Sequence, residues 1–205
     1  MNYTTLASRE SIDKTTNALK SRNIEVIFVE TRDLALAKIQ ELVPRGASIM
    51  NGASKTLEEI GFIEYLKSGA HGWNNLHESI IAEKDPVKQG MLRKQAVLSE
   101  YYVGSVHALT ESGEFVIASN TGSQLPHVVF TSPNLIFVVG AEKIVPTLTE
   151  ALERLEKHVV PLEDASMMQK YKIHTAPNKV LLFRGENPMM GRTVKMILVN
   201  ENLGF

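Results

Sequence analysis

The chain has 205 residues, of which 22 are Lys or Arg and 23 are Asp or Glu, so its formal net charge is −1. This length predicts one domain spanning residues 1–205, because single domains commonly hold about 100–200 residues. The balanced charge excludes a generally basic protein that coats nucleic acid, since that function needs clustered positive charge. Hydrophobic residues make up 43% of the chain, which is typical of globular proteins rather than disordered chains.

The chain contains no cysteine. Its own side chains therefore cannot supply a disulfide, a thiolate–metal site or an iron–sulfur cluster, and any cofactor stays unknown. No apolar run reaches the roughly 18 residues that cross a bilayer. Residues 1–5 lack the basic and apolar regions of a signal peptide. We expect a cytoplasmic protein with neither a nucleic-acid nor a membrane partner.

Helix-like and strand-like segments alternate along the chain. Apolar residues at helical spacing predict helices over residues 8–22, 34–43, 56–66, 86–99 and from 147 onward. Short apolar or β-branched runs predict strands over residues 24–29, 47–50, 101–103, 115–117 and 135–140, with a terminal pair of strands at 180–183 and 194–199. Ser112-Gly113 predicts a hairpin turn. This order predicts an α/β fold of three layers, Rossmann-like, with a mostly parallel sheet.

A small, polar segment follows the second predicted strand. Gly52 would allow a ligand to approach the backbone, Ser54 and Thr56 supply hydroxyls, and Lys55 supplies a charge. Such a turn before a helix can bind an anion. It is not a Walker loop, because Ser54 stands where that motif has glycine before the lysine. The alternative is ordinary helix capping, since Thr56-x-x-Glu59 matches a capping box.

A second polar segment follows the predicted strand 115–117. It includes Asn120, Gly122, Ser123 and Gln124. Lys143 follows the clearest buried strand, 135–140. Ligands in open α/β folds bind at the carboxyl ends of the strands, so these residues are candidate ligand contacts. A plain loop and a solvated lysine are the alternatives.

The segment around the predicted hairpin contains candidate acid–base residues. His107 titrates naturally near neutral pH, and Glu111 would serve as a base or nucleophile, with Thr110 beside it. A surface turn with solvated charges is the alternative. The remaining histidines show no metal-ligand spacing beyond a weak grouping of His71 and His77 with Glu78, so we predict no metal site.

Five short segments together resemble the lactate-utilization (LUD) domain family, of which this chain would be a Cys-free branch. The resemblance is strongest over residues 45–205, and the segments are 52–61, 108–113, 122–126, 138–154 and 191–205. It implies a fold like that of the sugar-phosphate isomerase, glucosamine-phosphate deaminase and CoA-transferase group, in which residues 52–56 would hold phosphate.

The sequence departs from this family in three places. Residues 171–179 contain no cysteine where many relatives carry several, His107 stands where many have Asn, and Ser123-Gln124 stands where many have Asn-Arg. The resemblance therefore does not imply that the chain handles lactate itself.

Three functions follow as hypotheses. In the first, the chain binds a small anionic ligand, such as a phosphorylated sugar, a carboxylate or a CoA thioester, and takes part in organic-acid utilization. In the second, it is a non-catalytic accessory or regulatory subunit of an oxidoreductase complex. In the third, it is a stand-alone isomerase or CoA transferase. We also expect a homo-oligomer, with Trp73 and Met189-Met190 as contact residues.

Overall fold

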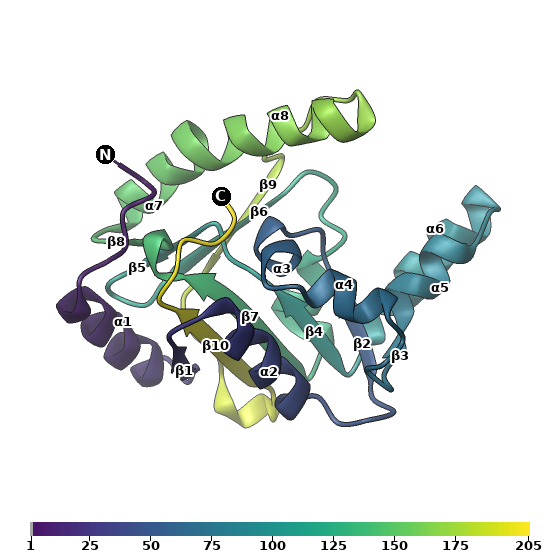
Figure 1. The fold of residues 1–205 in the computed structure, drawn as a ribbon, viewed down its shortest axis with the longest axis horizontal. Coiled ribbons are helices and arrows are strands. Elements are labelled where there is room, and N and C mark those ends of the chain that lie inside the picture. Colours follow the sequence, from purple (N-terminus) through teal and green to yellow (C-terminus); the bar gives the residue numbers. More distant parts are fainter. Residues whose placement is uncertain (1) are drawn as a thin grey trace.

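The computed structural model describes residues 2–205 and contains a six-stranded sheet in which every pairing is parallel (Figure 1). In spatial order its strands are β1 (Glu25–Val29), β10 (Thr193–Val199), β7 (Asn134–Gly140), β4 (Tyr101–Gly104), β2 (Ser48–Asn51) and β3 (Asn74–Asn75). Their carboxyl ends meet at one edge of the sheet, where parallel α/β sheets commonly bind ligands.

Strand β7 is at the centre of this sheet because both of its faces are apolar. Leu135, Phe137 and Val139 face one hydrophobic core, whereas Ile136 and Val138 face the other. A strand buried on both faces reads as a continuous apolar run, which explains why this segment was the clearest strand in the sequence.

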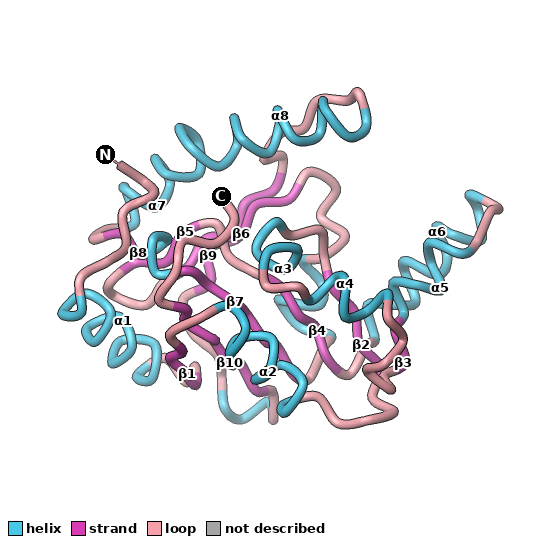
Figure 2. The backbone as a smooth tube through the Cα atoms, viewed as in Figure 1, coloured by secondary structure: helices cyan, strands magenta, loops and turns pink. Residues whose placement is uncertain are grey.

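Helices α2 (Arg32–Leu42), α3 (Lys55–Glu59) and α4 (Phe62–Lys67) cover one face of the sheet (Figure 2). Their buried residues include Ile39, Leu57 and Phe62. Beyond β3, helices α5 (Leu76–Ala82) and α6 (Pro86–Gln95) form an arm that extends away from the sheet. The loop expected over residues 68–77 is largely present, and β3 and the start of α5 occupy its end.

Helix α1 (Arg9–Ser21) and a second, four-stranded sheet cover the other face. The strands of this second sheet are, in spatial order, β8 (Ile144–Val145), β5 (Ala108–Thr110), β6 (Phe115–Ser119) and β9 (Lys179–Phe183). Phe115 packs between the two sheets. The centroid of its ring lies 4.6 Å from that of Phe183 on β9 and 5.3 Å from that of Phe137 on β7.

A long helical segment packs on the outer face of the second sheet. Helix α7 (Leu148–Arg154) continues through a π-helical turn over residues 155–159 into α8 (Val160–Tyr171). Thr147 caps its start by accepting a hydrogen bond from the Glu150 amide at 3.3 Å, and the helix begins where the sequence predicted. Helix α8 has no buried residue and passes over the carboxyl edge of the main sheet (Figure 1).

The prediction of an α/β, Rossmann-like fold with a mostly parallel sheet is confirmed. The predicted hairpin is also confirmed, because β5 and β6 pair in antiparallel fashion across Ser112-Gly113. The two strands predicted at 180–183 and 194–199 are present as β9 and β10, but they do not pair with each other. β9 pairs with β6 in the second sheet, whereas β10 lies between β1 and β7, because its residues are buried on both faces.

Replacing Phe115 tests how strongly the two sheets depend on each other. Phe115→Ala should lower the free energy of unfolding by about 3–5 kcal/mol, because it removes a fully buried ring between the sheets. Urea unfolding followed by circular dichroism measures this change. Phe130→Ala is the matched control, with an expected change within about 0.5 kcal/mol, because that ring is 65% exposed. Equal effects of the two substitutions would contradict the role of Phe115.

Candidate functional site

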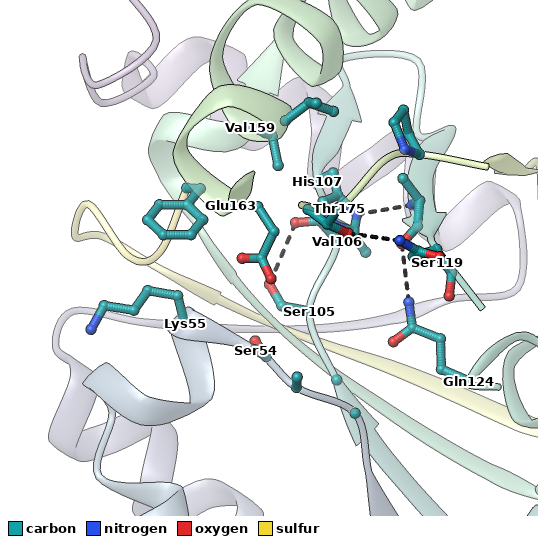
Figure 3. Close-up of a pocket in the computed structure, with 18 of the residues that line it drawn as sticks. Ser54, Lys55, Ser105, Val106, His107, Ser119, Gln124, Val159, Glu163 and Thr175 are labelled. Atoms are coloured by element: carbon teal, nitrogen blue, oxygen red, sulfur yellow. Dashed lines mark hydrogen bonds between the residues drawn. The ribbon is translucent and has the colours of Figure 1, made fainter. Parts of the chain in front are cut away.

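A cavity of about 320 Å³ opens at the carboxyl edge of the main sheet, under α8 (Figure 3). Four chain segments that each follow a strand line it, together with one face of the α7–α8 segment. The lining residues include Gly52, Ser54, Lys55, Thr56, Tyr102, Ser105, Val106, His107, Asn120, Ser123, Gln124, Lys143, Leu155, Val159, Glu163, Met167 and Thr175.

The buried ammonium of Lys143 is the main positive charge in the cavity wall. The residue is 3% exposed. Its Nζ donates to Thr56 Oγ1 at 2.9 Å, to Ser105 Oγ at 3.2 Å and to the Val106 carbonyl oxygen at 3.3 Å. All three partners are neutral, and burial lowers the pKa of Lys143 to about 8, against the opposing effect of Glu142. Lys143 is therefore mostly charged at neutral pH.

Thr56 links this lysine to the end of the chain. Its hydroxyl accepts from Lys143 and donates to the Leu203 carbonyl oxygen at 3.2 Å. Gly204, at φ +76°, leaves no room for a Cβ beside the Thr56 hydroxyl. Helix α3 is capped, as the alternative interpretation of this segment held, but by Ser54 and not by a Thr56–Glu59 capping box, since Glu59 accepts a hydrogen bond from the Gly204 amide at 2.7 Å.

His107 lies in the same wall in a defined neutral form. Its Nδ1 accepts a hydrogen bond from the Ala118 amide at 3.1 Å, so the proton of the neutral ring is on Nε2. Burial lowers the pKa of His107 to about 3, and the charges of Lys143 and Arg154 contribute to this decrease. The ring is therefore a hydrogen-bond donor at neutral pH and not a strong base.

Two further buried charges lie behind Lys143 and His107. Arg154 is fully buried and donates to the carbonyl oxygens of His107 and Phe205. Glu142 is 3% exposed, and burial raises its pKa, against the opposing effect of Lys143. Glu142 and, from α3, Glu59 act on Lys143 as negative charges, whereas Arg154 adds a second positive charge beside it.

Gly52 and Gln124 come together at the opposite wall of the cavity. Gln124 Oε1 accepts from the Tyr102 hydroxyl at 3.2 Å, and its Nε2 donates to the Ala118 carbonyl oxygen at 3.1 Å. A Cβ on Gly52 would lie 2.6 Å from Gln124 Oε1 and 2.7 Å from the Tyr102 hydroxyl. Glycine at this position therefore allows the first predicted segment to pass close to this pair.

The structure brings most of the predicted site residues to the cavity, namely Gly52, Ser54, Lys55, Thr56, His107, Asn120, Ser123, Gln124 and Lys143. Lys55 lies at its margin, with an exposed side chain that points away from the centre in Figure 3 and pairs with Glu58 at 3.4 Å. Among the described residues, the chemistry of the site therefore centres on Lys143 rather than on Lys55.

Three predicted residues do not line the cavity. Glu111 accepts from Lys14 Nζ and from Ser11 Oγ, both at 2.7 Å, so it is bound to α1. Thr110 is fully buried and bonds to Glu114 at 2.9 Å. Gly122 packs against the Lys179 side chain. Thr110 and Glu111 lie apart because β5 belongs to the second sheet and its end faces α1, whereas Gly122 lies in the loop after β6, against Lys179.

Sequence reasoning missed Glu163, whose carboxylate lines the cavity from α8. Leu155, Val159, Glu163 and Met167 follow one another at four-residue spacing and all line the cavity. Residues four apart share one face of a helix, so a lone carboxylate within this apolar stripe was the signal that could have indicated it. Ser105 was also missed, and it lies between two predicted segments.

No group of three or more His, Asp or Glu residues suited to a metal ion is present in residues 2–205. Within the same range, no helix is both long enough and apolar enough to cross a membrane.

These features define an α/β protein with a polar cavity at the carboxyl edge of its parallel sheet and a buried ammonium in the cavity wall. The LUD domain family model matches residues 12–180, and the chain belongs to this family. A search of curated proteins finds no match.

Two solved structures are similar to this one. The crystal structure of a DUF162 family protein from Deinococcus radiodurans is 13% identical, with a TM-score of 0.55 over 96% of this chain and 100% of that chain. This likeness supports the fold alone. The β subunit of eIF2B from Chaetomium thermophilum is 12% identical, with a TM-score of 0.29 over 68% of this chain and 44% of that one.

The protonation state of His107 can be measured directly by NMR. Its imidazole signals should show no titration step between about pH 7.5 and pH 5, because burial holds its pKa near 3. The unfolded chain in urea should titrate near pH 6.5, the ordinary value. The unfolded state then binds more protons, so the contribution of His107 to stability is complete above about pH 6.5 and is lost as the pH falls toward about 3.

His107→Asn assigns the signal and serves as the control for this titration. A folded-state midpoint between about pH 6 and pH 7 would contradict the neutral-donor assignment of His107.

Proposed function

We propose that this LUD-domain protein binds a small anionic ligand in the cavity, with the Lys143 ammonium as its anchor. The observation that carries this proposal is the buried Nζ of Lys143, whose three hydrogen bonds all go to neutral oxygens. Taking an ammonium out of water is costly, so a buried one that has no carboxylate bonded to it favours an incoming anion. Arg154 strengthens this preference from behind the wall.

Neutral donors around Lys143 would complete the anion site. His107 presents its Nε2 proton, and the Ser54 and Ser105 hydroxyls line the cavity beside it. The opposite wall supplies Ser123 and the Asn120 side chain, which is held by a 3.1 Å hydrogen bond to Thr175. Hydroxyl, imidazole and amide groups can bond both to an anion and to the hydroxyls of an organic ligand.

The size of the cavity narrows the ligand class. Ligand pockets commonly measure about 300–1000 Å³, and 320 Å³ is at the lower end of this range. A carboxylate or a phosphorylated sugar fits this volume better than a complete CoA thioester. The proposal includes a role of the protein in organic-acid utilization, which the family resemblance suggests. It also includes a cytoplasmic location, with which a chain free of cysteine is compatible.

Partner docking, as an accessory subunit of an oxidoreductase complex, is the second candidate function. The α5–α6 arm favours it, because α6 has no buried residue, and Ile81, Val87 and Met91 are 62%, 74% and 55% exposed. Met189 and Met190 are also exposed and remain candidates for self-association, whereas Trp73 is buried and donates to the Val43 carbonyl oxygen at 3.0 Å. The CoA-transferase alternative needs a carboxylate nucleophile in the cavity, and Glu111, the residue predicted for this role, lies outside it.

A thermal-shift panel of sugar phosphates, lactate, other hydroxy and keto acids, and CoA esters tests the first function. A ligand at about 100 times its Kd adds about 2.7 kcal/mol of stability. At this chain length that raises Tm by about 5–11 °C. Lys143→Met should weaken the binding of any hit by about 30-fold or more, because it removes the buried charge.

Two variants serve as controls for this loss. Lys67→Met removes a lysine whose side chain is 66% exposed on α4, and it should leave the binding unchanged. Lys55→Ala should weaken binding less than Lys143→Met does. A compound that binds Lys143→Met as tightly as the unmodified protein would contradict the role of Lys143 as the anchor. A panel in which no compound binds would favour the accessory-subunit function.

A further inference from the structure

The roof of the cavity carries a carboxylate that has no hydrogen-bond or ion-pair partner among residues 2–205. Glu163 on α8 is half-buried, and in Figure 3 its side chain extends into the cavity toward Ser105. No hydrogen bond within the described residues contributes to its pKa, which burial raises. Lys170, whose charge lowers the pKa of Glu163 against this effect of burial, is itself paired with Glu58 at 3.1 Å. Glu163 is thus free to bind a group of the ligand.

The surroundings of Glu163 make it unfavourable for its carboxylate to have no cation or hydrogen-bond donor bound to it. Leu155 and Val159 before it, and Met167 after it, line the cavity on the same face of the helical segment. A carboxylate among apolar side chains loses hydration and gains nothing in return unless a cation or a donor binds it.

The cavity therefore has opposite charges on two sides. Lys143 supplies an ammonium from the floor, at the end of the main sheet, and Glu163 supplies a carboxylate from the roof. Lys143 and Glu163 do not neutralise each other, because all three Lys143 hydrogen bonds go to Thr56, Ser105 and the Val106 carbonyl. A ligand with one negative group alone would satisfy the floor and leave the roof carboxylate unpaired.

We propose that the natural ligand is a small zwitterion, with an anionic group bound at Lys143 and a protonated amine bound at Glu163. Amino acids and phosphorylated amino sugars have this chemistry, whereas hydroxy acids and simple sugar phosphates lack the amine. The inference rests on the proposed anion site and names its ligand class. Electrostatic complementarity of this kind gives specificity, because the wrong partner leaves a charge unpaired.

Matched pairs of ligands that differ only in an amine or a hydroxyl test this inference by isothermal titration calorimetry. The pairs are L-alanine and L-lactate, 4-aminobutyrate and 4-hydroxybutyrate, and glucosamine 6-phosphate and glucose 6-phosphate. In at least one pair the amine should bind about 10-fold or more tightly. Glu163→Gln should remove this preference, because the amide keeps the shape and loses the charge.

Two variants separate the amine site from the anion site. Lys143→Met should weaken both members of the pair, whereas Glu163→Gln should weaken only the amine. Glu156→Gln changes an exposed carboxylate in the same helical segment and should leave both affinities unchanged. Urea unfolding confirms that each variant is folded before titration.

The outcomes distinguish this inference from the proposed function. If the hydroxyl member binds as tightly as the amine, or if Glu163→Gln leaves the preference intact, the zwitterion inference is overturned and the anion site stands. If no member of any pair binds to the unmodified protein, the anion site is overturned together with it.

Discussion

The site depends on one buried ammonium. Lys143 follows the central strand β7, and its Nζ holds the segment after β2 through Thr56 and the segment after β4 through Ser105 and Val106. Three neighbouring strands of the main sheet thus meet at one nitrogen atom. A parallel sheet brings their ends to the same edge, and the lysine fixes the distance between them there.

The same ammonium sets the electrostatics of the cavity. Burial keeps His107 neutral, the charges of Lys143 and Arg154 add to this effect, and the Ala118 amide fixes the ring proton on Nε2. The buried Glu142 offsets part of this positive charge from behind. Glu163 lies across the cavity on a different element and is not part of this cluster. A positive floor and an acidic roof therefore arise from separate parts of the chain.

The sequence predicted those features of the site that follow from strand order. Gly52, Thr56 and Lys143 follow strands of the main sheet, and a parallel sheet gathers such positions at one edge, whereas Gln124 reaches the same cavity from the end of β6 in the second sheet. Glu111 also follows a strand, but β5 joins the second sheet, where α1 binds this carboxylate. Local apolar patterns indicate that a strand exists and do not indicate which sheet it enters.

Glu163 shows a second limit of predicting the site from the sequence. It lies at the cavity only because α8 crosses over the edge of the sheet, which depends on the π-helical turn over residues 155–159 and on packing against the second sheet. The rule that binding residues follow the carboxyl ends of parallel strands does not identify a residue on a helix. The spacing of Leu155, Val159 and Met167 carried the signal, yet the direction in which this apolar face points is a tertiary property.

The central claim is that Lys143 is a buried, charged anchor for an anion. The most direct measurement is the NMR titration of the Lys143 side chain, labelled at Cε, in the free protein and in the presence of inorganic phosphate or L-alanine. The account predicts a midpoint near pH 8 in the free protein, and a higher midpoint when an anion binds beside it. A midpoint near the ordinary value of about 10.4, or one that neither compound changes, would contradict it.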